Sequence, residues 1–342
     1  MAAALVMVVA CGGRPAVHAN LYPLKPGVPP HAGTINYLGM PLRSGQIVLS
    51  ESPDTTSFVF SLVPHRFYYF THAGILSIED GEPYVYEASG ELATLPLHSK
   101  VLDNVVGVVR RWPLLEYATP NLYVEIIDIP DNVDGEASVR YSRAQFANKT
   151  PFDPFFRFED HSSLFCTEFL ELALRSGGAV PREPGAVSLQ ASLAIGKQWL
   201  GVPMDQALPA GLYYEPSRSV GAMGQFRSRT AAFAYFEAKR EIYRRFQAPN
   251  QRLGFVFELH GTGSVSLREP VRKFVTTAPS LFDRAHDLPA WGDARVTEAV
   301  RNYAEQLFGR ADEAPPPTAF PVTTRHVHYA ALGESRAASV TE

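Results

Sequence analysis

The sequence predicts an α+β protein in which an antiparallel sheet packs on a cysteine-bearing helix, followed by a C-terminal mixed extension. Two strand-like runs, 66–78 and 83–88, flank an Asp-Gly turn, a pattern typical of an antiparallel hairpin. Apolar residues recur at helical spacing around Cys166, and aromatic residues recur at the same spacing over 228–247, where a second helix is expected. With 46% hydrophobic and 19% charged residues, the body of the chain is expected to be globular.

The stretch around Cys166 is expected to form a helix that begins near Ser162 or Ser163 and ends at Gly177. A serine cap and a glycine stop would bracket the apolar repeat. Cys166 would then occupy the first turns, where free backbone amides and the helix dipole favour the negative charge of a thiolate. On this stretch alone a second interpretation stays open, because free cysteine is also among the most buried core residues.

The N-terminus carries an apolar run over residues 2–10, which is too short to span a bilayer but matches a signal-peptide core. The run ends in Val-Val-Ala-Cys-Gly, which resembles a bacterial lipobox, so Cys11 is expected to be lipidated and to become the new N-terminus. No Lys or Arg separates Met1 from the run, and an uncleaved apolar N-terminus is therefore the alternative. Residues 12–30, rich in Gly, Pro and Ala, are expected to form a tether.

Other regular elements follow from local patterns. Strands are expected at 45–50, 105–110 and 122–129, and a short polar helix at 142–149. In the C-terminal third, four aromatic residues lie on one face of the helix over 228–247. A small hairpin is expected over 253–259 and 264–267, and a helix from Asp293 to Gly309. The aromatic stripe consists of Phe233, Phe236, Tyr243 and Phe246.

Composition excludes several classes of partner and cofactor. The formal net charge of −4, without any basic run, gives no general affinity for nucleic acid. The only two cysteines, Cys11 and Cys166, cannot build a disulfide framework. His326 and His328 could place two imidazoles on one face of a strand, but with no third ligand nearby a surface position is expected. We therefore expect neither a metal nor another cofactor.

A cysteine hydrolase needs an imidazole within reach of the thiolate and a group that orients the imidazole. His72 is expected in the middle of a strand and Glu87 in the paired strand, so the two side chains can lie on one face of the sheet. Taken singly, His72 could be structural and Glu87 could face water. His161, five residues before Cys166, is the rival base, although its loop offers less rigidity than a strand.

Four fragments in this order resemble the circularly permuted branch of the NlpC-type papain-like cysteine hydrolases, and most closely its YiiX/YebB-like members. The fragments are Gly45-Gln46-Ile47-Val48-Leu49, Thr71-His72-Ala73-Gly74-Ile75, Val85-Tyr86-Glu87-Ala88 and Phe165-Cys166-Thr167-Glu168-Phe169. In this branch the histidine strand precedes the cysteine helix, as it does here, and the resemblance spans about residues 40 to 180. Gln46 departs from the family, which usually has an acidic residue after the glycine.

The resemblance implies Cys166 as nucleophile, His72 as base and Glu87 as the residue that orients the base. Together with the composition of the flanking segments, it leads us to expect four parts: a signal, lipobox and tether (1–30), a permuted papain-like hydrolase domain (31–210), a C-terminal extension packed on that core (211–310) and a flexible tail (311–342). The expected function is that of a bacterial envelope lipoprotein on the periplasmic side, cleaving an amide or peptide bond, as in cell-wall peptides. An acyl-lipid substrate and a non-catalytic binding module are the alternatives, and the oligomeric state stays open.

Overall fold

The computed structural model describes residues 19–22, 24, 32–92, 105–186, 206–248, 253–259, 265–283 and 289–310. These ranges do not include Cys11, His326, His328, residues 311–342 and most of the segment 1–30. The predictions made for these residues stay predictions. In the part of the chain that is described, no helix combines the length and the apolar character needed to cross a membrane.

A seven-stranded sheet forms the centre of the molecule, in the order β1-β11-β8-β4-β5-β6-β7, and every pairing in it is antiparallel. Its strands, in chain order, are β1 (Asn20–Tyr22), β4 (Ile47–Glu51), β5 (His72–Glu79), β6 (Glu82–Leu92), β7 (Val105–Pro113), β8 (Tyr123–Ile127) and β11 (Ser219–Gly224). Short two-stranded sheets are formed by β2 (Ile35–Tyr37) with β3 (Met40–Leu42), β9 (Gly185–Ala186) with β10 (Gln206–Ala207), and β12 (Phe257–Leu259) with β13 (Val265–Leu267). The protein is therefore α+β with a large antiparallel sheet.

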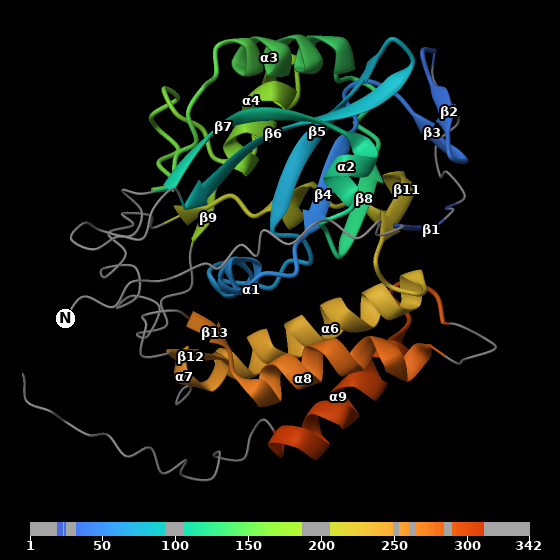
Figure 1. The fold of residues 1–342 in the computed structure, drawn as a ribbon, viewed down its shortest axis with the longest axis vertical. Helices are drawn as coiled ribbons and strands as arrows, with labels where there is room; N and C mark the ends of the chain where they lie inside the picture. Colours follow the sequence, from blue (N-terminus) through green and yellow to red (C-terminus); the bar gives the residue numbers. More distant parts are fainter. Residues whose placement is uncertain are drawn as a thin grey trace, which may run out of the picture.

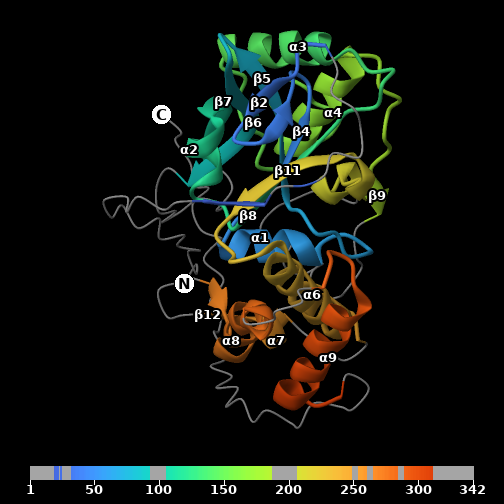
Figure 2. The same ribbon diagram turned by 90° about the vertical axis from the view of Figure 1, so that its right-hand side faces the viewer.

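Helices cover both faces of this sheet (Figures 1 and 2). One face carries α3 (Gly135–Ala147) and α4 (Cys166–Ser176), and the other carries the short α2 (Leu114–Ala118). A second layer, formed by α6 (Arg229–Phe246), α8 (Glu269–Thr277) and α9 (Ala294–Phe308), lies beyond one end of the strands, with α1 (Thr55–Leu62) between it and the sheet. The one-turn helix α7 (Leu253–Val256) precedes β12.

The hairpin of β5 and β6 forms as predicted, with Asp80 and Gly81 both at positive φ (52° and 84°) in the two-residue turn. A glycine is also required at the start of β4. Gly45 has a φ of 90°, and a Cβ there would lie 2.3 Å from the Cα of Gly135. The next residue, Gln46, is buried and accepts a hydrogen bond from the Arg43 backbone amide at 3.0 Å. In this chain Gln46 therefore ties the start of β4 to the preceding turn.

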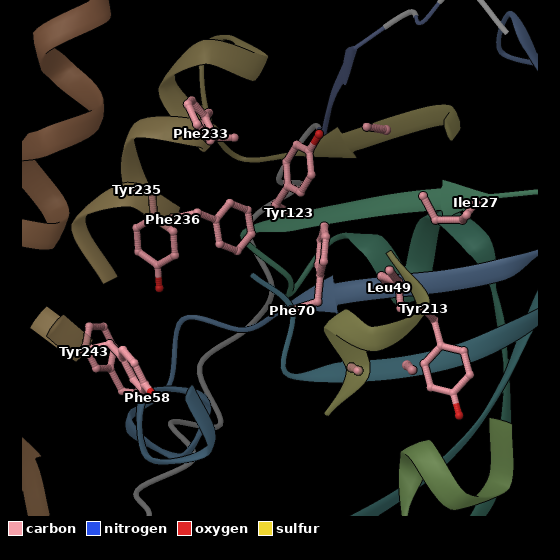
Figure 3. Close-up of a cluster of buried hydrophobic side chains, with 14 of the residues drawn as sticks. Leu49, Phe58, Phe70, Tyr123, Ile127, Tyr213, Phe233, Tyr235, Phe236 and Tyr243 are labelled. Carbon is pink, nitrogen blue, oxygen red and sulfur yellow. The ribbon is translucent and has the colours of Figure 1, made fainter. Parts of the chain in front are cut away.

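Phe236, in the aromatic stripe of α6, packs against Tyr123 at the end of strand β8 (Figure 3). The Phe236 ring lies 5.3 Å from Phe70 and 5.8 Å from Tyr123, measured between centroids. Ser228 caps the helix by accepting a hydrogen bond from the Ala231 amide at 3.0 Å. The predicted bounds of α6 and α9, including the stop at Gly309, are confirmed.

Several predicted bounds are wrong. The strand expected over 66–78 begins only at His72, the helix expected over 142–149 runs over Gly135–Ala147 with Asp134 as its cap, and the 253–259 segment begins as a helical turn.

Two expected domain boundaries conflict with the sheet. β1 lies within the segment expected to be a tether, and β11 follows residue 210 but pairs with β8 and β1 inside the main sheet.

Candidate active site

Cys166 is the first residue of helix α4 and is partly exposed. The serine cap is wrong, because the helix begins three residues later than expected, with Phe165 as the N-cap residue. Glu168, the third helical residue, makes the reciprocal bond of a capping box by accepting a hydrogen bond from the Phe165 backbone amide at 3.4 Å. Gly177 ends the helix as predicted. A thiol at the first helical position lies beside backbone amides that have no acceptor within the helix.

His72 is the first residue of β5 rather than a mid-strand residue, so its ring lies at an end of the sheet. Its Nε2 atom is hydrogen-bonded to Glu87 Oε2, and the ring also makes a hydrogen bond to Cys166. Burial lowers the pKa of His72, but the charges of Cys166 and Glu87, with the hydrogen bonds to both, raise it well above its ordinary value. The structure thus brings together all three residues that the sequence proposes for catalysis.

Glu87 is held by two donors on different elements. Besides the His72 ring, Trp112 of β7 donates its indole Nε1–H to Glu87 Oε1 at 3.0 Å. Burial raises the pKa of Glu87, but the charge and hydrogen bond of His72 and the bond from Trp112 lower it below its ordinary value. An ionised Glu87 with a fixed geometry can orient the imidazole and stabilise its protonated form.

Sequence reasoning missed both Trp112 and Tyr117 as parts of this site. Tyr117, from α2, is buried, and its hydroxyl group lies 2.8 Å from Ser50 Oγ. Burial raises the pKa of Tyr117 well above its ordinary value, and the nearby charges of Glu87 and Cys166 raise it further. Ser50 lies opposite His72 in the β4–β5 pair, so Tyr117 is hydrogen-bonded to the strand next to the one that carries the imidazole. No local pattern in the sequence marks either residue, because they reach the site through strand register and helix packing.

The rival base, His161, pairs with a different carboxyl group. Its Nδ1 atom lies 2.7 Å from Glu168 Oε1, and about half of the His161 side chain is exposed. Burial raises the pKa of Glu168 to about 7, although its hydrogen bond to His161 acts in the opposite direction. The site therefore contains two His–Glu pairs. The His72–Glu87 pair is hydrogen-bonded to the Cys166 thiol through the His72 ring. The His161–Glu168 pair joins the loop before α4 to the first turn of that helix.

A cavity of about 570 Å³ opens beside Cys166. Its walls are mostly apolar and aromatic, formed by α1, by the segment before β5, and by the loop before α4. They include Phe60, Phe70, Phe156, Phe158, Phe165 and Leu208. Charged side chains, Arg157, Glu159 and Asp160, line the part formed by the loop. The arrangement can hold a largely apolar group next to the thiol.

No group of three or more His, Cys, Asp or Glu side chains that could hold a metal occurs within the described ranges.

Comparison with solved structures finds a structural likeness. Neither the protein-family models nor the curated proteins contain a match to this chain. The chain is similar to the crystal structure of the metalloprotein yiiX from Escherichia coli O157:H7, with a TM-score of 0.40 and 16% sequence identity. The similarity covers 52% of this chain and 95% of that chain.

Proposed function

We propose that this chain is a cysteine hydrolase of the permuted papain-like type, which transfers an acyl group through a thioester on Cys166. The observation that carries the proposal is the hydrogen-bonded series Cys166–His72–Glu87 beside an apolar cavity. This series combines nucleophile, base and orienting carboxylate, the arrangement by which a protein thiol is activated.

In the proposed reaction His72 holds the proton of the Cys166 thiol, and the thiolate attacks the carbonyl carbon of the substrate. His72 then donates this proton to the leaving group, and a water molecule, deprotonated by His72, hydrolyses the thioester. The Cys166 backbone amide, at the first residue of α4, is a natural donor to the oxyanion. Glu87, oriented by Trp112, keeps the imidazole aligned through both steps.

The location proposed for this activity is the bacterial envelope, on a lipid anchor at Cys11, where cell-wall peptides would be the substrate. The apolar walls of the cavity favour a second candidate, an acyl-lipid thioesterase or acyltransferase, because aromatic walls beside the thiol suit an acyl chain. Release of muropeptide fragments by the purified protein would support the first candidate, and release of fatty acid would support the second.

A thiol-directed test separates both enzymes from a non-catalytic binding module. Wild-type protein should be alkylated rapidly at Cys166 by iodoacetamide near neutral pH, and His72→Ala should slow this reaction at least tenfold. His161→Ala is the matched control, since His161 pairs with Glu168 instead. Two results would contradict the proposal that this chain is an enzyme. In one, Cys166 of the wild type is alkylated no faster than a small-molecule thiol; in the other, the alkylation rate is the same in His72→Ala as in the wild type.

A further inference from the structure

A buried ion pair joins helix α6 to the end of strand β4. Lys239 Nζ contacts Glu51 Oε1, and neither side chain has any exposed surface. The ammonium group also lies 5.0 Å from the centroid of the Phe58 ring. Burial lowers the pKa of Lys239, and the charges of Glu51 and Asp54 oppose this change. Fully buried lysine is rare in proteins, so its presence here needs a reason.

The Glu51 carboxylate gathers hydroxyl groups from three parts of the chain. Ser57 of α1 donates to Oε1 at 2.7 Å, and Tyr235 of α6 donates to the same oxygen at 3.1 Å. Thr71, in the segment before β5, donates to Oε2 at 3.0 Å. Both carboxylate oxygens are therefore satisfied, which is what a buried charge requires.

This network ends at the candidate active site. Thr71 lines the cavity beside Cys166 and directly precedes His72 in the sequence. In the β4–β5 pair Ser50 lies opposite His72, and Glu51 is the next residue after Ser50. The Glu51 carboxylate thus holds residue 71 at the point where β5 begins.

Stability alone does not explain this ion pair. Replacing a buried pair by well-packed apolar residues of similar volume is often neutral or stabilising, because desolvation offsets the attraction between the charges. A buried pair does fix the relative position of the elements that carry it, since a displaced charge loses its partner. Position is what an imidazole beside a thiol needs, and a misplacement of about 1 Å can cost about a hundredfold in rate.

We propose that Lys239 is a positioning residue, which acts through Glu51 and Thr71 to hold His72 against Cys166. The reactivity of the thiol then depends on helix α6 of the C-terminal layer. This inference rests on the proposed function for the role of His72, and it adds Glu51 and Lys239, neither of which lines the cavity.

Thr71→Val tests the link without removing a buried charge. It should slow the alkylation of Cys166 by iodoacetamide roughly tenfold or more, whereas Thr71→Ser, which keeps the hydroxyl group, should recover most of the rate. The pKa of His72, followed by the NMR signals of its ring, should fall toward the ordinary value in Thr71→Val. A general loss of stability would not move the pKa of one residue in the folded protein.

Lys239→Met should have the same two effects, and the double variant with Thr71→Val should be no slower than the slower single variant, because both act along one chain of contacts. Arg244→Met is the matched control, since Arg244 pairs with Glu241 within the same helix. If Lys239→Met fails to fold, Thr71→Val alone decides the matter. Folded variants with the wild-type alkylation rate and an unchanged His72 pKa would overturn the inference. A His72→Ala variant that keeps the wild-type rate would instead overturn the proposed function, and the NMR titration would still decide whether the network positions the ring.

Discussion

Glu168 is a fully buried carboxyl group in the first turn of the cysteine helix, and burial raises its pKa to about 7. A carboxyl group whose pKa is raised on folding stabilises the protein below its unfolded value of about 4.3 and loses this contribution as the pH rises through the folded value. Glu168→Gln cannot ionise. The unfolding free energy of this variant relative to the wild type should therefore rise between about pH 4.3 and 7. Urea denaturation across this range measures it, and a constant difference would contradict the assignment.

Cys166 is expected to contribute chemistry rather than stability. Cys166→Ala should abolish hydrolysis while the melting temperature stays close to that of the wild type, because the partly exposed thiol leaves little cavity behind. Glu87→Gln should retain more activity than His72→Ala, since Glu87 orients the base and does not itself carry the proton. Turnover assays beside melting curves check both statements. Full turnover by Cys166→Ala would disprove the nucleophile.

The three residues proposed for catalysis could be found from sequence because each lies in a short fragment with a local helix or strand pattern, although the predicted helix start and the mid-strand position of His72 were wrong. Trp112 and Tyr117 could not. Trp112 reaches Glu87 only through the register of β6 with β7, and Tyr117 reaches the site through the packing of a five-residue helix. Registers of this kind depend on tertiary packing, which a single sequence does not specify.

Among the elements, α6 joins the two layers. Phe236 has no exposed surface and contacts aromatic rings of both layers, including Phe70, Tyr123 and Trp291. Phe236→Ala should lower the unfolding free energy by about 3–5 kcal/mol, through lost burial and the cavity that remains. Phe146→Ala in α3 is the control, because Phe146 is 41% exposed. Urea denaturation gives both values. Equal losses would mean that the aromatic contact between the layers is not a stabilising one.

Helix α6 was predictable because a strong apolar period and a serine cap agree with each other. Strand β11 was not, although it lies inside the main sheet. Its sequence, Ser-Val-Gly-Ala-Met-Gly, has small residues on both faces, all of them buried, so neither alternation nor β-branched residues mark it. Gly221 approaches Met40 so closely that an added Cβ would lie 2.3 Å from its sulfur atom. Close packing thus accounts for at least one of the small residues that conceal the strand.

For the whole molecule, the position of β11 leads to a truncation test. A chain ending after Gly211 would lose β11 and α6, which would expose the edge of β8, the aromatic rings beneath α6 and the uncompensated charge of Glu51. The fragment should be insoluble or unfolded by circular dichroism. A soluble fragment that melts at the temperature of the full chain would show that the C-terminal third is an independent module.

The lipid anchor makes a separate prediction for the whole chain. Wild-type protein should be recovered cut before Cys11 and acylated, and Cys11→Ser should move it to the soluble fraction. Each buried methylene group contributes about 0.8 kcal/mol, so two or three acyl chains would hold the protein firmly on a membrane. Mass spectrometry that finds Met1 intact and no acyl chain would contradict the anchor.

The insertion of β11 between β1 and β8 also sets the order in which the protein can fold during synthesis. Strand β8 pairs with β4 on one edge, but its other edge has no partner until Ser219–Gly224 has been made. Strand β1, the first to emerge, must wait for the same segment, because it pairs with β11. Contacts so distant in sequence form slowly, and an open sheet edge can meanwhile pair with another chain. The nascent protein would thus need its edge shielded until β11 closes the sheet.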